Sequence, residues 1–428
     1  MKSKMSRRSQ TRREFLRRSL AATGGLLLTG QESWSIDRVR RPKLPVAGVA
    51  TVYRRDSHAD VVLGKILEGW NQDGGPGPDL ELVSLYLDQY PKNDMSRTLA
   101  KKHGFRLAKT IDEAINLGGD KVGVAGVLSI GEHGTYPRHP VTNQLLYPRK
   151  RFFDEIVAAL KRGGKVVPVF NDKHLSYDTA QAVAMCRTAE DLKIPFMAGS
   201  SLPVAWRIPG LELPMGCEVE CALGIGFGGL EAYGFHALEM LQCMVERRKG
   251  GETGVAAVRS ATGDAVLEAE KQGYWSEPLL AAALRAQRLE LPEGWRETIT
   301  KDSLPFYLID YRDGLKASIA MLNGIAGHWS FACKLKGQEA PIATEFALQA
   351  GRPYRHFECL VRAIEHLVHS GESPYPVERT LITTGVIDAA MRSLAAKGKR
   401  LETPELAIGY RASAWAYTPG VPPKPRKE

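Results

Sequence analysis

The N-terminal half of the chain alternates short apolar runs with amphipathic stretches. The apolar runs are typical of strands buried on both faces of a sheet, and they lie at residues 46–53, 80–87, 121–130 and 165–170. Residues 152–161 have the spacing of an amphipathic helix, and Ser57 and Asp60 have the spacing of a capping box at a helix start. This alternation predicts a parallel sheet covered by helices.

The C-terminal half mixes strand and helix patterns. Residues 306–335, with a turn at Asp313-Gly314, are expected to form antiparallel hairpins. Residues 357–370 and 377–397 have the periodicity of amphipathic helices. The end of the chain is rich in Pro and Lys, so we expect it to be a loose tail.

The net charge of +10 is concentrated at the N-terminus. Residues 1–41 hold eleven Lys or Arg and three acidic residues, which leaves the rest of the chain with a balance of only +2. This distribution gives no sign of a surface that binds nucleic acid.

The basic N-terminus contains a twin-arginine pattern. Residues 11–17 read Thr-Arg-Arg-Glu-Phe-Leu-Arg, and a mild apolar stretch follows at residues 20–29. We therefore expect the twin-arginine translocase to export the folded protein to the periplasm or another extracytoplasmic space. A basic unstructured tail is the alternative. Without a clear cleavage site the segment can also persist as an anchor, and elsewhere no apolar run approaches the ~20 residues that span a bilayer.

These patterns together predict an α/β fold class. An N-terminal Rossmann-like domain with a doubly wound parallel sheet is followed by a C-terminal α/β domain with a mainly antiparallel sheet. The expected boundaries are 1–41 for the signal and linker, 42–176 for the first domain, 177–410 for the second and 411–428 for the tail.

Polar side chains are concentrated where the predicted strands of the parallel sheet end. In chain order they are Arg54, Arg55, Asp56 and His58, then Asp88, then Glu132 and His133, then Asp172, Lys173 and His174. In doubly wound sheets the ligand crevice lies outside the carboxyl ends of the strands. We therefore expect a site at this edge.

Lys173 is the first candidate catalytic residue. It lies between a carboxylate and an imidazole just beyond a predicted strand. An ammonium group in that place can donate a hydrogen bond to a substrate hydroxyl or phosphate. The alternative is a solvated lysine in a turn.

His236 and Glu239 form the second candidate, since they lie three residues apart on one face of a predicted helix. An imidazole beside a carboxylate is the arrangement of an oriented general base. The pair could also bind a metal, or His236 could be a capped histidine in the core.

Metal binding has little support in the spacing of the possible ligands. The imidazoles that could surround one divalent cation are those of His58, His133, His174 and His236, and no two of them have HxH or HxxxH spacing. Six cysteines are scattered without the pattern of a zinc site. Cys217 and Cys221 form a CxxxC pair, which an oxidising compartment would allow to form a disulfide.

The order of these pieces resembles the Gfo/Idh/MocA oxidoreductases, the family of glucose-fructose oxidoreductase and inositol 2-dehydrogenase, over roughly residues 44–410. The family's Glu-Lys-Pro motif supplies a catalytic lysine, and Asp172-Lys173-His174 looks like its counterpart. The resemblance therefore implies a catalytic role for Lys173.

The family's Asp-x-Gly-x-His-x-x-Asp element is similar to residues 232–239, which contain His236 and Glu239. The first Asp of that element is missing here, and Glu231 lies one residue away. The resemblance thus implies a catalytic set of Lys173, His236, Glu231 and Glu239.

The resemblance also implies bound NAD or NADP, although the first turn departs from the family. Family members have a Gly-x-Gly-x-x-Gly loop that lets the backbone approach the pyrophosphate, whereas residues 53–58 of this chain read Tyr-Arg-Arg-Asp-Ser-His. These side chains would crowd a dinucleotide, although two arginines at a helix N-terminus can attract phosphate. Asp88 resembles the acid that holds the adenosine ribose. The expected cofactor-binding set is Arg54, Arg55, Ser57, His58, Asp88, Glu132 and His133.

The sequence therefore favours an exported oxidoreductase that acts on a sugar or polyol with tightly bound NAD or NADP. Lys173 would polarise the reacting oxygen and His236 would move its proton. One alternative keeps the fold without the redox cofactor, as a hydrolase, lyase or isomerase, and the altered first turn favours it. Another is a non-catalytic carbohydrate-binding protein. Family members commonly pair through the open sheet of the second domain, so the resemblance implies a homo-oligomer.

Overall fold

The structure is a computed structural model that describes residues 42–301 and 303–426. These residues belong to one compact unit, which begins at Pro42. The predicted twin-arginine signal lies outside the described residues. No helix in the described part of the chain is long and apolar enough to cross a membrane.

The first sheet has six strands. They span Leu44–Ala50 (β1), Leu80–Leu87 (β2), Arg106–Ala108 (β3), Gly126–Ile130 (β4), Val169–Asp172 (β5) and Phe196–Gly199 (β6). Their order is β3-β2-β1-β4-β5-β6, and every neighbouring pair is parallel. This is the strand order of a doubly wound, dinucleotide-binding sheet, so the predicted fold of this part is confirmed.

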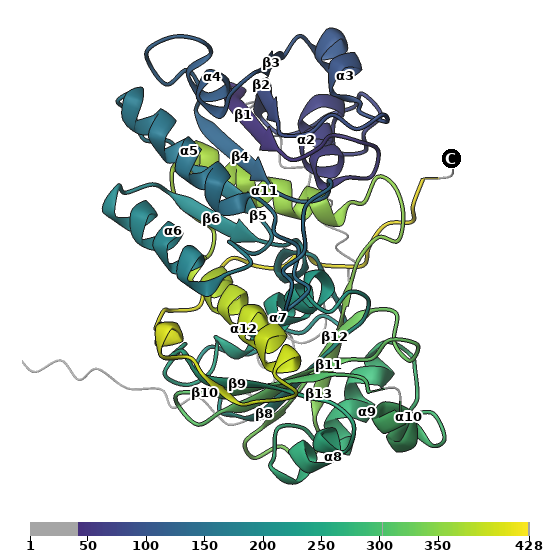
Figure 1. The fold of residues 1–428 in the computed structure, drawn as a ribbon. Coiled ribbons are helices and arrows are strands. Elements are labelled where there is room, and N and C mark those ends of the chain that lie inside the picture. Colours follow the sequence, from purple (N-terminus) through teal and green to yellow (C-terminus); the bar gives the residue numbers. More distant parts are fainter. Residues whose placement is uncertain (1–41, 302, 427–428) are drawn as a thin grey trace, which may run out of the picture. The chain divides into compact units, whose positions relative to one another are not determined.

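Helices cover both faces of this sheet (Figure 1). They span His58–Glu68 (α2), Ser96–His103 (α3), Ile111–Asn116 (α4), Arg149–Arg162 (α5), Thr179–Asp191 (α6) and His356–Ser370 (α11). Helices α2 and α11 pack on one face, and α4, α5 and α6 pack on the other. Alternate residues of β1 serve the two faces, since Val46 and Ala50 join the first cluster whereas Ala47 and Val49 join the second.

The second sheet has eight strands. They span Trp206–Ile208 (β7), Val219–Gly226 (β8), Val255–Ala261 (β9), Phe306–Tyr311 (β10), Lys316–Met321 (β11), Trp329–Leu335 (β12), Ile342–Ala347 (β13) and Leu401–Glu402 (β14). Their order is β14-β9-β10-β11-β8-β12-β13-β7, and only β11 and β8 pair in parallel. The mainly antiparallel sheet is confirmed. The antiparallel hairpin expected at the Asp313-Gly314 turn is confirmed, because β10 and β11 pair there. It does not extend to β12, because β8 pairs between β11 and β12.

Helices also cover both faces of the second sheet. They span Ala232–Val245 (α7), Asp264–Lys271 (α8), Glu277–Ala286 (α9), Trp295–Lys301 (α10) and Val377–Ala395 (α12), with short 3₁₀ helices at Leu202–Val204 and Pro404–Leu406. Helices α7 and α12 pack on one face, and α8, α9 and α10 pack on the other. Along β10, Tyr307 joins the first cluster, whereas Phe306 and Leu308 join the second.

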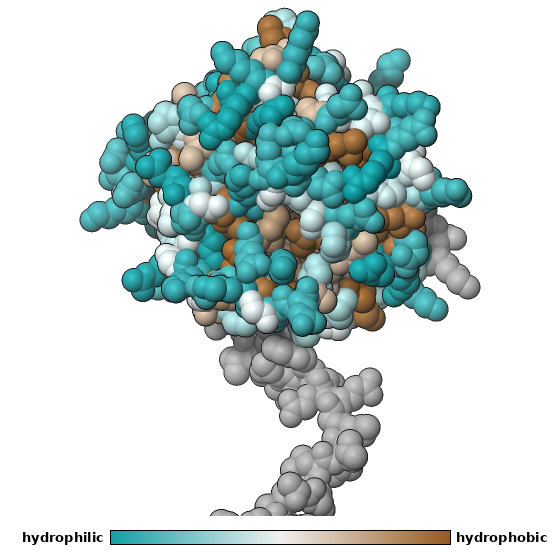
Figure 2. Space-filling model, turned by 90° about the horizontal axis from the view of Figure 1, so that it is seen from below, coloured by the Kyte–Doolittle hydropathy of each residue, from teal (hydrophilic) through white to brown (hydrophobic). Residues whose placement is uncertain are grey.

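In the family that the sequence resembles, chains commonly pair through an open face of this second sheet. Here the chain's own helices cover both of its faces. Figure 2 views the molecule from below, the side on which α8 lies in Figure 1, and shows hydrophobic residues only in patches among hydrophilic ones. The predicted homo-oligomer thus lacks the bare sheet on which it was based.

Some predicted boundaries differ from those of the structure. The strand at residues 80–87 and the helices at 357–370 and 377–397 are confirmed to within a few residues. The apolar run at residues 165–170 begins too early, because the strand starts at Val169 and includes Asp172. Strand β6, which was not predicted, extends the parallel sheet beyond the expected boundary at residue 176.

The C-terminal residues are attached to the rest of the unit. The N–H and Oγ1 of Thr418 both donate to the carbonyl of Val204. The side-chain amide of Gln349 donates to the carbonyls of Pro423 and Lys424. The expected loose tail was wrong, because the carbonyls of this Pro-rich segment accept hydrogen bonds from a buried side chain.

Candidate active site

The carboxyl ends of β1, β4 and β5 lie side by side, as the sequence predicts. The Oγ of Ser57 accepts the N–H of Asp60 at 3.3 Å, so the predicted cap is confirmed and α2 begins at His58. The hydroxyl of Thr51 donates to the carbonyl of Glu132. This bond fastens the loop after β4 to the end of β1.

Glu132 lies at the centre of a buried charge network. Its Oε1 is 3.0 Å from Nζ of Lys173 and its Oε2 is 2.6 Å from Nη2 of Arg149. Arg149 Nη1 lies 2.9 Å from Nε2 of His174. Burial disfavours the carboxylate, but the positive charges of Lys173 and Arg149 outweigh it and hold the pKa of Glu132 well below its usual value. Glu132 is therefore an anion that compensates two buried cations.

Lys173 is held in a strained backbone conformation. Its φ is +62°, and its N–H donates to the carbonyl of Gly199 at 3.0 Å. A residue other than glycine in this region is strained by about 1–3 kcal/mol, and it persists where the surroundings determine it. The side chain of Lys173 is only 5% exposed. A solvated turn lysine is thereby excluded.

His58 is oriented by Asp172. Its Nδ1 lies 2.6 Å from Oδ2 of Asp172, whose side chain is 1% exposed. The ring of His133 packs edge-on against His58, with 5.3 Å between ring centroids. Burial, together with the charge of His58, lowers the pKa of His133 to about 4, so His133 is neutral at pH 7. The two expected cofactor ligands form a histidine pair beside a carboxylate.

His236 lies on α7, with its ring centroid 5.8 Å from that of Trp329. Burial and the charge of Lys173 hold the pKa of His236 well below its usual value. Its Nδ1 is buried and has no hydrogen-bond partner among the described residues. A neutral imidazole that is not otherwise engaged can take a proton from a bound molecule.

Glu239 does not form the predicted pair with His236. Its Oε2 accepts the N–H of Ser200 at 3.2 Å, and its Oε1 accepts the hydroxyls of Thr383 at 2.8 Å and Thr380 at 3.3 Å. Burial raises the pKa of this carboxyl group. Donors from the end of β6 and from α12 occupy the carboxylate, so Glu239 fastens α7 to both elements.

Glu231, just before α7, contacts the other side of the charge network. Its Oε2 accepts the N–H of Leu145 at 2.9 Å, and its Oε1 lies 3.7 Å from Nε2 of His174. Burial and the charge of Arg149 lower the pKa of His174. Glu231 therefore ties the loop after β4 to the start of α7.

Arg149, the second cation of the network, was not among the predicted site residues. It begins a run of three basic residues, which is typical of a solvated helix end. The informative signal was the helical spacing, because Phe152 and Phe153 follow at three and four positions and are buried. That spacing places Arg149 on the buried face of α5.

Asp88 follows β2 and already has three partners. Its carboxylate accepts hydrogen bonds from the hydroxyls of Tyr136 at 2.6 Å and Tyr86 at 3.0 Å, and from the guanidinium of Arg151. Burial opposes the charged form, but these bonds outweigh it and lower the pKa of Asp88. The segment that carries Tyr136 thus crosses the end of β2.

The polar groups at the start of α2 are also bonded to other groups of the protein. The N–H of Asp56 donates to Oδ2 of Asp60 at 2.9 Å. Nη1 of Arg352 lies 2.8 Å from Oδ1 of Asp56 and 2.6 Å from Oδ2 of Asp60. Arg54 is half-buried nearby, whereas the side chain of Arg55 is 60% exposed. The N-terminus of α2, where a phosphate would bind, therefore carries the carboxylates of Asp56 and Asp60, and both are paired with Arg352.

No group of three or more His, Cys, Asp or Glu in residues 42–301 and 303–426 has the arrangement of a metal site. All six cysteines are free thiols, so Cys217 and Cys221 are not joined.

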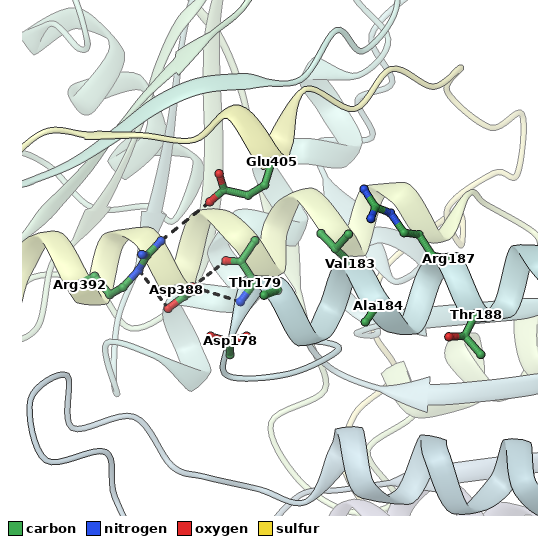
Figure 3. Close-up of a pocket in the computed structure, with 10 residues that line it drawn as sticks. Asp178, Thr179, Val183, Ala184, Arg187, Thr188, Asp388, Arg392 and Glu405 are labelled. Carbon is green, nitrogen blue, oxygen red and sulfur yellow. Dashed lines mark hydrogen bonds and ion pairs between the residues drawn. The ribbon is translucent and has the colours of Figure 1, made fainter.

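A groove of about 580 Å³ lies between α6 and α12 (Figure 3) and involves none of the charge network. Thr179 donates its N–H and its hydroxyl to Oδ2 of Asp388, at 3.2 and 2.6 Å. Arg392 lies 3.5 Å from Asp388 and 4.0 Å from Glu405. These polar groups satisfy one another, so the groove is a seam between two helices.

No family model matches the chain, and no curated protein matches its sequence. Solved structures do match most of its length. GenD2 from gentamicin A biosynthesis, in complex with NAD, has a TM-score of 0.53 and 16% identity, covering 85% of this chain and 97% of its own. The chain shares the fold of this NAD-bound protein.

Two further structures share it. Apo scyllo-inositol dehydrogenase from Lactobacillus casei has a TM-score of 0.51 and 10% identity, covering 84% of this chain and 98% of its own. An oxidoreductase from Agrobacterium radiobacter, in complex with NAD+, L-tartaric acid and magnesium, has a TM-score of 0.50 and 14% identity, with the same coverage. This dehydrogenase fold agrees with the resemblance to the Gfo/Idh/MocA oxidoreductases.

In a dehydrogenase fold the dinucleotide lies across the carboxyl ends of the first strands. The carboxylate of Asp88, to which the family resemblance would assign the adenosine ribose, is occupied here by Tyr136 and Arg151. A pyrophosphate at the start of α2 would meet the carboxylates of Asp56 and Asp60 and would compete with them for the guanidinium of Arg352. The residues present therefore do not fit a dinucleotide in the usual pose.

Proposed function

We propose that the protein is an enzyme that acts on a sugar-like substrate by proton transfer, as an isomerase or lyase, without a dinucleotide. One observation carries this proposal. At the carboxyl edge of the parallel sheet, Glu132 holds the ammonium group of Lys173, and the buried Nδ1 of His236 has no partner among the described residues. Burial, and then the charge of Lys173, lower the pKa of His236 and keep its ring neutral. An ammonium donor and an imidazole base within electrostatic reach are the two parts that enolisation of a carbonyl compound requires.

Lys173, His236 and His58 have different roles in the proposed reaction. Lys173, positioned by Glu132, donates a hydrogen bond to the substrate carbonyl and stabilises the negative charge that develops on its oxygen. His236 takes a proton from the neighbouring hydroxyl-bearing carbon to give an enediolate. In an isomerisation it returns that proton to the former carbonyl carbon, while the hydroxyl proton passes to the former carbonyl oxygen. In an elimination a hydroxyl group leaves instead, and His58, oriented by Asp172, protonates it.

A nicotinamide-dependent oxidoreductase acting on a sugar or polyol is the second candidate. The shared fold supports it, because GenD2 and the Agrobacterium radiobacter oxidoreductase were solved with NAD. It requires Tyr136 to leave Asp88 and Arg352 to leave the start of α2. Export in folded form would then require NAD or NADP to be bound tightly in the cytoplasm.

The deciding experiment incubates the purified protein in D₂O with a panel of aldoses, ketoses and keto-cyclitols, with and without NAD or NADP. Deuterium incorporation at carbon without nucleotide supports the isomerase or lyase, and it is expected to disappear in His236→Gln and Lys173→Met. Oxidation that depends on added or copurified nucleotide would support the oxidoreductase. Sugar binding without either reaction would leave a carbohydrate-binding protein.

We also propose export through the twin-arginine translocase, on the pattern at residues 11–17. The test is fractionation of cells that produce the wild type or the double variant Arg12→Lys/Arg13→Lys. The wild type is expected outside the cytoplasm and the variant inside it. Equal distribution of the two would contradict the proposal.

A further inference from the structure

A cluster of aromatic rings surrounds His236 on the side of the second sheet. Phe227 follows β8, Tyr233 lies in the first turn of α7, and Trp329 begins β12. The rings of Tyr233 and Trp329 are stacked, with centroids 5.5 Å apart and an interplanar angle of 21°. The ring of Phe227 lies 4.5 Å from that of Trp329 and 5.5 Å from that of Tyr233.

Tyr233 is the exposed member of this cluster. Its exposed fraction is 39%, whereas Trp329 beneath it is 8% exposed. Tyr233 and His236 lie three residues apart and so share one face of α7, with ring centroids 6.1 Å apart. The solvent-facing aromatic ring therefore stands next to the proposed base.

The turn after β8 holds the ring of Tyr233 in place. Gly228 has a φ of +79°, and a Cβ at this position would lie 2.8 Å from Cδ1 of Tyr233. The N–H of Gly228 donates to Oδ1 of Asn323, and Nδ2 of Asn323 donates to the carbonyl of Gly228 at 3.1 Å. The backbone of Gly228 and the ring of Trp329 thus both restrict the ring of Tyr233, which remains 39% exposed.

Two polar atoms of the cluster lack partners among the described residues. They are Nε1 of Trp329 and Nδ1 of His236, and both are buried. Buried polar atoms are normally hydrogen-bonded, so unpaired ones call for an explanation. A molecule with one apolar face and several hydroxyl groups matches this combination, because its C–H face packs on an aromatic ring while its hydroxyls form hydrogen bonds.

We propose that Tyr233, backed by Trp329 and Phe227, is the platform on which one face of a pyranose or cyclitol ring stacks. The platform determines specificity for cyclic sugars over open-chain polyols and places the ring beside His236. The inference rests on the proposed function, whose substrate class it narrows.

The test measures binding of methyl β-D-glucopyranoside and scyllo-inositol to the full-length protein by tryptophan fluorescence and saturation-transfer NMR. Mannitol, which has no ring face, is the comparison ligand. Tyr233→Ala is expected to weaken binding of the cyclic probes about tenfold, and Tyr233→Phe to preserve it. Binding of mannitol is expected to be weak in every variant.

Tyr90→Ala is the matched control. Tyr90 is 43% exposed and also packs against one neighbour, the guanidinium of Arg97 at 5.1 Å, so its replacement removes a similar surface ring elsewhere. Gly228→Ala gives a second route, because its methyl group would displace the ring of Tyr233 without removing it. It is expected to weaken the same cyclic probes.

The proposal is overturned if Tyr233→Ala binds both cyclic probes as tightly as the wild type, or if the wild type prefers mannitol. Failure of the proposed function looks different. A wild type that binds the cyclic probes through Tyr233 but exchanges no proton in D₂O keeps the platform and removes the isomerase or lyase. His236→Gln is expected to lose exchange.

Discussion

The Nδ1 atom of His58 lies 2.6 Å from Oδ2 of Asp172, although 114 positions separate the two residues in the chain. The contact joins the first residue of α2 to the last residue of β5. It fixes the orientation of the imidazole at the edge of the sheet where Lys173 also lies.

Replacing Asp172 by Asn keeps the shape of the side chain but removes its charge. We expect the rate with an accepted sugar to fall roughly 10²–10⁴-fold, the usual contribution of a positioned acid or base, with little change in KM. Steady-state kinetics measure it. Asp88→Asn is the control, because Asp88 serves Tyr136 and Arg151 and is expected to leave the rate unchanged. Full activity of Asp172→Asn would remove His58 from the reaction.

Lys173→Met removes the donor to the substrate oxygen but leaves Glu132 paired with Arg149. We expect roughly a 10²–10³-fold loss of kcat, as when an oxyanion donor is removed. The loss of folding free energy is expected to stay below the ~3–5 kcal/mol of a fully broken buried pair. Kinetics and urea unfolding measure the two effects. A variant that is active yet unstable would show that Lys173 serves only the fold.

His356 predicts a pH dependence of stability. Burial and the charge of Lys65 lower the pKa of His356 to about 3 in the folded protein, against about 6.5 when unfolded. The unfolded state binds more protons between these values, so stability is complete above pH 6.5 and falls on acidification, by at most about 1.4 kcal/mol per pH unit. Urea unfolding at several pH values measures the slope, which His356→Gln should reduce. An unchanged slope would refute this assignment.

Glu239 and His236 both lie on α7. We expect Glu239→Ala to affect stability and His236→Gln to affect catalysis. Glu239→Ala leaves the buried N–H of Ser200 without its acceptor, and an unpaired buried group destabilises by about 1–3 kcal/mol. The hydroxyls of Thr380 and Thr383 can still donate to the carbonyls of Ala198 and Thr380. We expect a lower unfolding midpoint but unchanged activity per folded molecule, whereas His236→Gln should lose activity and keep its midpoint. If both variants lost activity equally with intact folding, Glu239 would belong to the reaction.

The covered faces of the second sheet predict a monomer. Trp275 and Leu280, among others from the segment of α8 and α9, pack against Leu308 and its neighbours on the sheet, where a partner chain would otherwise bind. Light scattering over a range of concentrations should give the mass of one chain. A stable dimer would restore the homo-oligomer implied by the family resemblance and would require a different interface.

Local pattern was sufficient for much of the fold and part of the site. Apolar runs placed the strands of the parallel sheet, and their polar ends brought His58, Glu132, Asp172 and Lys173 to one edge. These assignments succeed because side-chain periodicity and strand ends are local properties of the chain.

The remaining features depend on contacts between distant residues. Arg352 reaches Asp60 from 292 positions away, and Glu239 meets Thr383 across 144 positions. Spacing put Glu239 beside His236, but hydroxyl groups of another helix captured its carboxylate. A local sequence pattern does not show which distant donor will form a hydrogen bond to a buried carboxylate.

Helix α12 packs against β6 of one sheet and against α7 and β9 of the other. The carboxylate of Glu239 on α7 accepts hydrogen bonds from Ser200, at the end of β6, and from Thr383 on α12. A helix that packs against both sheets in this way opposes rotation of one sheet relative to the other. We therefore expect substrate to enter and leave without a change in the angle between the two sheets, so that domain closure does not limit turnover.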